Sequence, residues 1–159
     1  MDSFNTSPAD SLSEEHEAVR ALTQLLKLEQ EHLIAANVEG VASLTESKAK
    51  TAARMAELAA RRHKALGAAG FEAKESGMKT WLESTATSVT TTKSWHELIE
   101  LAEAAKELNR VNGTLIHKQM VRNQNVLNVL QHGSILGNNV YGPNGQTTNK
   151  SIGRHISAG

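Results

Sequence analysis

Apolar residues recur every three or four positions along two successive stretches of the chain, which is the spacing that places them on one face of an α-helix. Between the two stretches lies Asn37–Gly40, a polar segment that suits a helix end and a tight turn. The regular spacing holds when a few polar or charged residues on the same face are counted as members of each stripe. The first stripe consists of Leu12, Glu15, Val19, Leu22, Leu26, Glu29, Leu33 and Ala36. The second stripe consists of Val41, Leu44, Lys48, Thr51, Met55, Leu58, Arg62 and Ala65. The pattern predicts two long helices, the second ending near Gly67–Gly70.

The two stripes match when the chain is folded back on itself at Asn37–Gly40. Facing positions of an antiparallel hairpin have residue numbers with a constant sum, and in this register apolar residues mostly face apolar residues. The same register places Glu29 opposite Lys48 and Glu15 opposite Arg62. A slipped register would leave a buried charge unpaired, at a cost of about 3–5 kcal/mol. We therefore expect these two ion pairs to fix the alignment of the hairpin.

The segment Phe71–Thr92 contains few large apolar residues and has only a weak period. A short helix starting near Ser76 is predicted there. Serine and threonine side chains compete with the helix for backbone hydrogen bonds, so the run Ser84–Ser94 predicts a loop or an irregular stretch.

Two serine residues predict where helices begin. Ser11 precedes Glu14, and Ser94 precedes Glu97, by the three positions that are typical of a capping box. After the second box, helical spacing continues and predicts a long final helix over Trp95–Leu130. The sequence therefore predicts an all-α fold: an elongated antiparallel helical bundle with a long N-terminal hairpin, a short middle helix and a long C-terminal helix.

The C-terminal half of this final helix is apolar over a wide arc. One seam of the helix contains polar residues from Asn112 onward and consists of Leu98, Leu101, Ala105, Leu108, Asn112, Leu115, Gln119, Arg122, Val126 and Val129. A second stripe lies on the adjacent face. That stripe consists of Ile116, Met120, Asn123, Leu127 and Leu130. Such a helix requires more than one neighbour. Either these residues pack against the segment Phe71–Thr92 of the same chain, or they bind a helix of a partner.

The 159 residues suit one domain. We expect residues 1–10 to form a disordered N-terminus and residues 11–130 to form a single helical bundle domain. Residues 131–159, rich in Gly, Asn and Ser, are expected to form a flexible C-terminal tail.

Composition excludes several classes of protein. The formal net charge is zero, and a nucleic-acid-binding protein ordinarily carries an excess of Lys and Arg. The dense basic group Arg61–Lys64 is better explained by its position near the predicted helix end. The chain has no Cys, no apolar stretch over residues 1–13 that would form a signal peptide, and no run long enough to span a bilayer. We therefore expect a soluble cytoplasmic protein without stable membrane insertion.

Catalytic and metal-binding patterns are also missing. The best metal candidate is Glu29-x-x-His32, but a di-iron site in a bundle requires a second Glu-x-x-His, and no other His follows a Glu by three positions. Glu29 is moreover expected to pair with Lys48. The remaining His residues are scattered, which favours surface positions. We expect no enzyme activity, no metal, no cofactor and no small-molecule substrate.

In the segment Asn109–Gly113, two Asn residues and one Gly weaken the middle of the predicted final helix, Gly113 alone by about 1 kcal/mol. Close backbone packing at a helix crossing is the favoured interpretation of this glycine. The alternative is a flexible point between a docked half and a ligand-facing half of the helix.

Several short motifs follow one another along the chain: Glu29 and Lys48 in a helical hairpin, Arg61 or Arg62 near its end, Leu108-Asn109-x-x-Asn112-Gly113-x-Leu115-Ile116, and Tyr141-Gly142-Pro143-Asn144-Gly145. In their order and spacing, these motifs resemble the FlgN family of flagellar export chaperones over roughly residues 15–146.

The resemblance implies a helical chaperone that binds the carboxy-terminal helices of the hook-filament junction proteins, which are also called hook-associated proteins. Such a chaperone prevents premature assembly of these proteins and delivers them to the flagellar export gate. The carboxy-terminal helical region of the family contacts the cargo, which implies partner-binding roles for Ile116, Met120, Leu127 and Leu130. The family's Tyr-Gly-x-x-Gly stretch docks at the gate, which implies that role for Tyr141. The alternative is a structural coiled-coil adaptor or oligomerisation module without a chaperone role.

Overall fold

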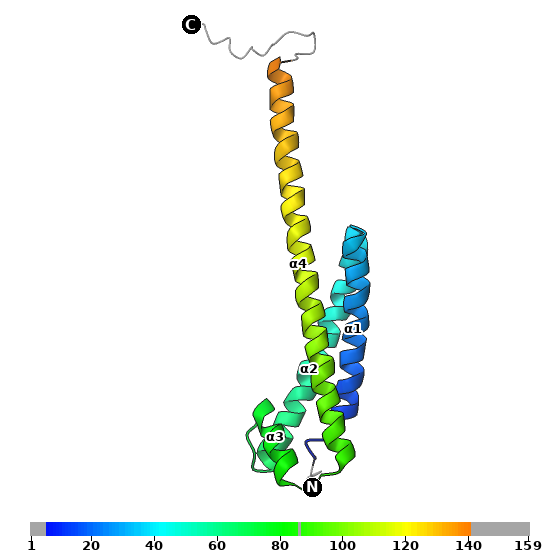
Figure 1. The fold of residues 1–159 in the computed structure, drawn as a ribbon, viewed down its shortest axis with the longest axis vertical. Helices are drawn as coiled ribbons and strands as arrows, with labels where there is room; N and C mark the ends of the chain where they lie inside the picture. Colours follow the sequence, from blue (N-terminus) through cyan, green and yellow to red (C-terminus); the bar gives the residue numbers. More distant parts are fainter. Residues whose placement is uncertain (1–5, 86, 141–159) are drawn as a thin grey trace. The chain divides into compact units, whose positions relative to one another are not determined.

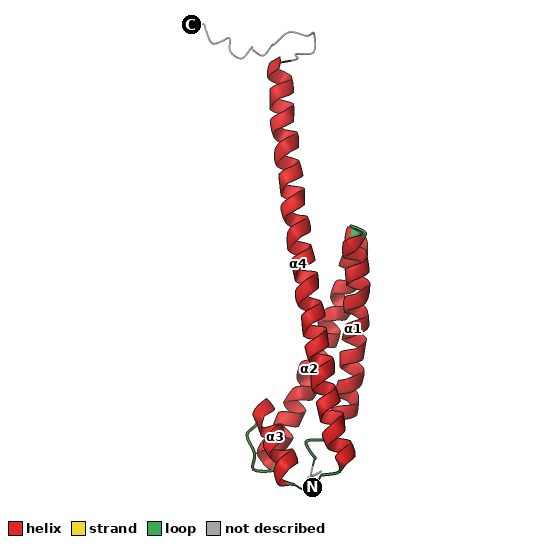
Figure 2. Ribbon diagram, in the orientation of Figure 1, coloured by secondary structure: helices red, strands yellow, loops and turns green. Residues whose placement is uncertain are grey.

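The computed structural model describes residues 6–85 and 87–140, and every regular element in these residues is an α-helix (Figures 1 and 2). The helices are α1 (Leu12–Ile34), α2 (Val38–Ala68), α3 (Glu75–Ser84) and α4 (Val89–Val140). The prediction of an all-α fold is confirmed. The chain divides into two compact units, Met1–Leu115 and Ile116–Gly159. The single domain predicted for residues 11–130 spans this boundary, and α4 contributes to both units.

Helices α1 and α2 form the antiparallel hairpin of the first unit and lie side by side in Figure 1. The turn is Ala35–Asn37, with Ala36 in the left-handed region at φ 54°. The side chain of Asn37 accepts a hydrogen bond from the Gly40 N–H and so caps α2. The predicted turn Asn37–Gly40 is therefore corrected, because its last three residues already form the first turn of α2.

The C-terminus of α2 lies within the predicted range Gly67–Gly70. Gly70 takes φ +90°, a conformation that an L residue adopts only with strain. The next residue, Phe71, donates its N–H to the Leu66 carbonyl at 2.9 Å, and Gly70 donates to the Gly67 carbonyl at 3.1 Å. This pair of hydrogen bonds is the Schellman motif, which satisfies carbonyl groups at the helix end.

Both predicted capping boxes are wrong. Ser11 occupies the N-cap position of α1, but its hydroxyl donates to Glu15 Oε2 at 2.9 Å, and no side chain caps the helix. Ser94 lies inside α4, which starts at Val89 because Ser88 is available as a cap. The Ser88 hydroxyl accepts the Thr91 N–H at 3.1 Å. The irregular stretch predicted for Ser84–Ser94 therefore ends before Val89, and the residues from Val89 onward are helical.

Helix α4 continues to Val140, ten residues beyond the predicted end at Leu130. Part of the predicted tail, residues 131–140, is therefore helical. At the other end of the chain, Ser7–Asp10 form a turn in which the Ser7 N–H donates to Asp10 Oδ2 at 2.8 Å. The remaining parts of the predicted disordered N-terminus and flexible tail, residues 1–5 and 141–159, lie outside the described residues.

The apolar core of the first unit draws on all four helices. Helix α4 contributes through Trp95, Leu98 and Ala105, which the predicted three- and four-residue spacing places on one face. The buried cluster consists of Leu12, Val19, Leu26, Leu66, Met78, Trp81, Trp95, Leu98 and Ala105. The first part of α4 thus completes a packed bundle with the hairpin and α3.

Candidate partner-binding surface

The second unit exposes large apolar side chains along its helical residues. Met120 is 64% exposed, Leu127 is 54% exposed and Leu130 is 62% exposed. Placed at the helical interval of about 100° per residue, five of the exposed apolar side chains cover roughly half of the helix circumference, and Val121, which is 45% exposed, lies outside that arc. We refer to the following residues as the apolar face: Met120, Val126, Leu127, Val129 and Leu130. Several large apolar residues in water on one helix indicate a surface for another protein.

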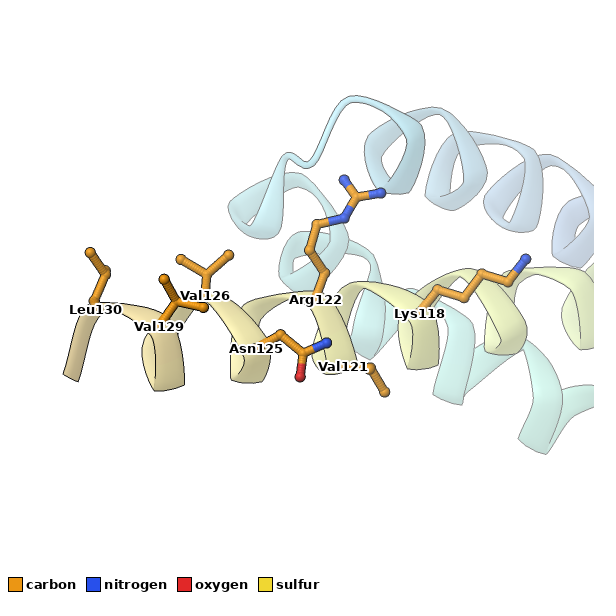
Figure 3. Close-up of a pocket in the computed structure, with 7 residues that line it drawn as sticks. All are labelled: Lys118, Val121, Arg122, Asn125, Val126, Val129 and Leu130. Carbon is orange, nitrogen blue, oxygen red and sulfur yellow. The ribbon is translucent and has the colours of Figure 1, made fainter. Parts of the chain in front are cut away.

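A shallow hollow adjoins this face and is lined only by residues of α4. Figure 3 shows Lys118 and Arg122 extending from the same side of the helix as Val126, Val129 and Leu130. The hollow therefore combines a positively charged end with an apolar end. Val121 and Asn125 complete the lining.

The predicted partner-binding residues differ in their surroundings. Met120, Leu127 and Leu130 are exposed, whereas Ile116 is half-buried. Leu130 alone among them lines the hollow, because the other three lie on the adjacent face of the helix. Tyr141 lies outside the described residues. The valines Val121, Val126 and Val129 were not singled out from the sequence as partner-binding residues, although the seam that ends at Val129 gave a signal for two of them.

In the first unit, the structure brings Glu15 and Arg62 together. The Arg62 Nε lies 3.1 Å from Glu15 Oε2, and both side chains are almost fully buried. The same guanidinium donates through Nη2 to Glu75 Oε1 at 2.9 Å and lies 4.6 Å from the ring centre of Trp95. Arg62 thus connects α1, α2, α3 and α4. Its place in the basic group reflects this contact and not an interaction with the end of α2, which continues to Ala68.

The second predicted pair is also in contact: Lys48 Nζ lies 2.5 Å from Glu29 Oε2. Asn112 of α4 completes this cluster, donating through Nδ2 to Glu29 Oε1 at 2.9 Å and to the Leu26 carbonyl at 2.8 Å. Asn112 is fully buried, so its amide ties α4 to α1 at one level. The sequence showed Asn112 only as a polar break in an apolar seam, and nothing local identified its partners.

His16 does not occupy the surface position that the scattered His pattern favoured. It is buried, and its Nε2 donates to the Ser94 carbonyl of α4 at 2.8 Å. This hydrogen bond links the start of α1 to α4. The three polar contacts at His16, Arg62 and Asn112 therefore set the position of α4 in the first unit, up to Leu115.

Acid should weaken the contact between Glu75 and Arg62. Burial raises the pKa of Glu75, but the hydrogen bond and positive charge of Arg62, and then those of His63, outweigh it, so the pKa lies below the ordinary 4.5. A carboxylate with a lowered folded-state pKa stabilises the fold above its unfolded pKa and loses that contribution as the pH falls through the folded value. The stability difference between wild type and Glu75→Gln should therefore shrink below about pH 4.5 in urea titrations. A difference that is constant from pH 7 to pH 3 would contradict this contact.

Gly113 does not serve close packing. A Cβ at this position would meet no atom within 4 Å, which overturns the favoured interpretation of a tight helix crossing. Gly113→Ala should raise the free energy of unfolding by about 0.5–1 kcal/mol, because alanine restricts the unfolded chain and favours the helix. Gly77 provides the contrast, since its Cβ would lie 1.9 Å from the Glu72 carbonyl oxygen, and Gly77→Ala should cost about 1–3 kcal/mol. Equal effects in urea unfolding would contradict these surroundings.

Within the described ranges, 6–85 and 87–140, no group of three or more His, Asp or Glu side chains is arranged to hold a metal ion. Glu29, the best metal candidate from the sequence, is engaged by Lys48 and Asn112. No helix in the described part of the chain is long and apolar enough to cross a membrane.

A family model described as FlgN protein matches residues 1–149 of the chain. Comparison of the chain with curated proteins and with solved structures found no match. The matched range contains all of the first compact unit and residues 116–149 of the second, including the hairpin ion pairs and the apolar face.

Proposed function

The chain belongs to the FlgN family of flagellar export chaperones, and we propose that it binds the helical termini of the flagellar hook-filament junction proteins. In this role it prevents their premature assembly and delivers them to the flagellar export gate. It acts in the cytoplasm and without enzymatic activity. A chaperone role in flagellar export follows from the family, and the particular cargo and the delivery step are the proposal.

The observation that carries this proposal is the exposure of the apolar face. A single helix gains most of its stability from packing an apolar stripe against a neighbour. Met120, Leu127 and Leu130 are each more than half exposed, so the second unit has apolar area to bury on a partner. An amphipathic partner helix can supply anchors at the same three- and four-residue spacing.

The roles of individual residues follow from this arrangement. Met120, Leu127 and Leu130 contact the cargo helix, and the half-buried Ile116 supports the end of that contact nearest the first unit in sequence. The family resemblance gives Tyr141 the role of docking at the export gate. The ion pairs Glu29–Lys48 and Glu15–Arg62 keep the hairpin in register.

Co-purification with the hook-associated proteins tests the proposal. Met120→Gln with Leu127→Gln removes two apolar contacts while keeping helix propensity nearly constant. Because burial of each such side chain contributes about 1.5–3 kcal/mol, the two losses together amount to about 3–6 kcal/mol, and the double variant should bind cargo at least roughly 100-fold more weakly. Leu28→Gln with Ile34→Gln is the matched control, since these α1 residues are exposed apolar residues of the first unit.

Unchanged capture by the Met120 and Leu127 variant, or equal loss in the control, would contradict the assignment of the cargo site. The alternative function, a structural coiled-coil adaptor or oligomerisation module, makes a different prediction. It requires the same apolar face to bind a second copy of the chain. Light scattering of the purified protein would then show a dimer that the double glutamine variant dissociates.

A further inference from the structure

The acidic residues of this chain are distributed unevenly. All 17 of them lie at or before Glu107, whereas basic residues continue to Arg154. The second unit consequently contains Lys and Arg but no carboxylate. The zero net charge of the whole chain therefore hides a cationic C-terminal part.

Two of these cations stand next to the apolar face. Lys118, Arg122, Val126 and Leu130 follow each other at four-residue intervals and form one ridge along α4. All four line the hollow, and Figure 3 shows their side chains on the same side of the helix. The ridge is thus positively charged in its first half and apolar in its second half.

Neither cation has a carboxylate partner among the residues that the structure describes. In the first unit, by contrast, exposed cations commonly pair with a neighbouring acid, as Arg61 does with Glu57 at 2.8 Å and Arg110 with Glu107 at 2.7 Å. Two like charges four residues apart destabilise a helix slightly. An acidic partner would remove this cost and give the two cations the counter-charges that the second unit itself lacks.

We infer that the partner of the apolar face is an amphipathic helix of another protein that carries acidic residues at one end of its apolar stripe, placed to meet Lys118 and Arg122. This inference rests on the proposed function and adds the charge of the cargo helix to it. A helix that packs ridge into groove against α4 brings its apolar stripe to Val126 and Leu130. Carboxylates about one helical turn apart then face the two cations.

Other occupants fit the ridge less well. The second unit of another copy offers no Asp or Glu side chain. Helices that bind anionic membranes carry many Lys and Arg residues and usually Trp or Phe. The stretch from Ile116 to Leu130 has two such cations and no aromatic residue. The remaining polar positions are mostly Asn and Gln, which suit contacts to a protein helix.

Synthetic amphipathic helices test the inference directly against the full-length chain. Three peptides share one leucine stripe and carry two glutamates, two glutamines or two lysines at one end of it. Exposed ion pairs each contribute about 0.2–1 kcal/mol, so the glutamate peptide should bind roughly two- to thirtyfold more tightly than the glutamine peptide. This preference should decrease with added salt.

Variants of the chain provide the controls. The variant Lys118→Glu with Arg122→Glu should reverse the order of peptide affinities, so that the lysine peptide binds best. The control variant Arg20→Gln with Lys27→Gln removes one Arg and one Lys from exposed positions of α1 and should leave the order unchanged. Equal binding of the three peptides, or an order that Lys118→Glu with Arg122→Glu does not alter, would overturn the inference. If the chain bound anionic phosphatidylserine vesicles through Lys118 and Arg122 and showed no preference among the three peptides, the inference would be overturned in favour of a lipid surface.

The failure of the inference and the failure of the proposed function are distinguishable. Capture of hook-associated proteins that is insensitive to Lys118→Glu with Arg122→Glu would overturn the charge assignment and leave the chaperone proposal standing. Tight binding of the glutamate peptide without capture of any hook-associated protein would support the charge assignment and overturn the proposed cargo.

Discussion

Replacing Arg62 by methionine should lower the free energy of unfolding by about 3–5 kcal/mol, because Glu15 would remain buried without its counter-charge. Arg62 has only 4% of its side chain exposed, and Glu15 has 7%. Methionine keeps an apolar stem of similar length, so the variant removes the charged group while retaining much of the packing. The contacts to Glu75 and Trp95 are lost as well, which affects α3 and α4 together.

Urea unfolding followed by Trp fluorescence measures this effect, since Trp81 and Trp95 both lie in the first unit. Arg61→Met is the matched control, because Arg61 is the exposed neighbour, and its ion-pair partner among the described residues is the exposed Glu57. This control should change stability by at most about 1 kcal/mol. Adding Glu15→Gln to Arg62→Met should recover part of the loss by removing the stranded charge. A loss for Arg62→Met no larger than that for Arg61→Met would contradict the connecting role of Arg62.

The second large effect is expected at Glu29. Glu29→Lys should cost about 3–5 kcal/mol, because the new ammonium would lie buried against Lys48 and the amide of Asn112. Exchanging both charges, with Lys48→Glu added, should restore an ion pair in the same register. The recovery should be incomplete unless Asn112 turns its amide oxygen toward the new lysine, since Nδ2 now donates to Glu29.

A double-mutant cycle in urea measures the coupling between the two positions, which is expected at about 1–3 kcal/mol. The exposed pair Glu46 and Lys50 is the control, and its exchange should show coupling below about 0.5 kcal/mol. Additive losses at Glu29 and Lys48 would show that the pair does not determine the alignment of the hairpin.

The hairpin could be predicted from sequence because its register is over-determined. Apolar spacing sets the faces of α1 and α2, and the two charge pairs allow only one alignment, so Glu29 meets Lys48 and Glu15 meets Arg62. This information is contained in α1, α2 and the short turn that joins them. It required no knowledge of α3 or α4.

The features that the sequence did not predict depend on contacts between distant segments. Glu75 and Trp95 meet Arg62 only because α3 and α4 pack on the hairpin, and Asn112 finds Glu29 across more than 80 positions. Local propensity also misplaced the start of α4. The Thr-rich residues after Ser88 are weak helix formers, but the cap at Ser88 and the buried Trp95 lie on either side of them and favour the helix.

The candidate site was likewise predicted from the sequence only in part. Periodicity identified Ile116, Met120, Leu127 and Leu130 as a stripe, and three of these are exposed in the structure. The ridge from Lys118 to Leu130 was not recognised, because its cations interrupt the apolar pattern. Only the hollow lined by these side chains shows charge and apolar area side by side on one surface of the helix.

Hydrogen exchange of the full-length chain, with and without a bound hook-associated protein, tests whether a cargo helix covers the apolar face. Binding should slow the exchange of backbone amides over residues 116–133 and should leave exchange in the hairpin helix α2 unchanged. Slowed exchange confined to α1, α2 or α3, with residues 116–133 exchanging as in the free protein, would contradict this prediction.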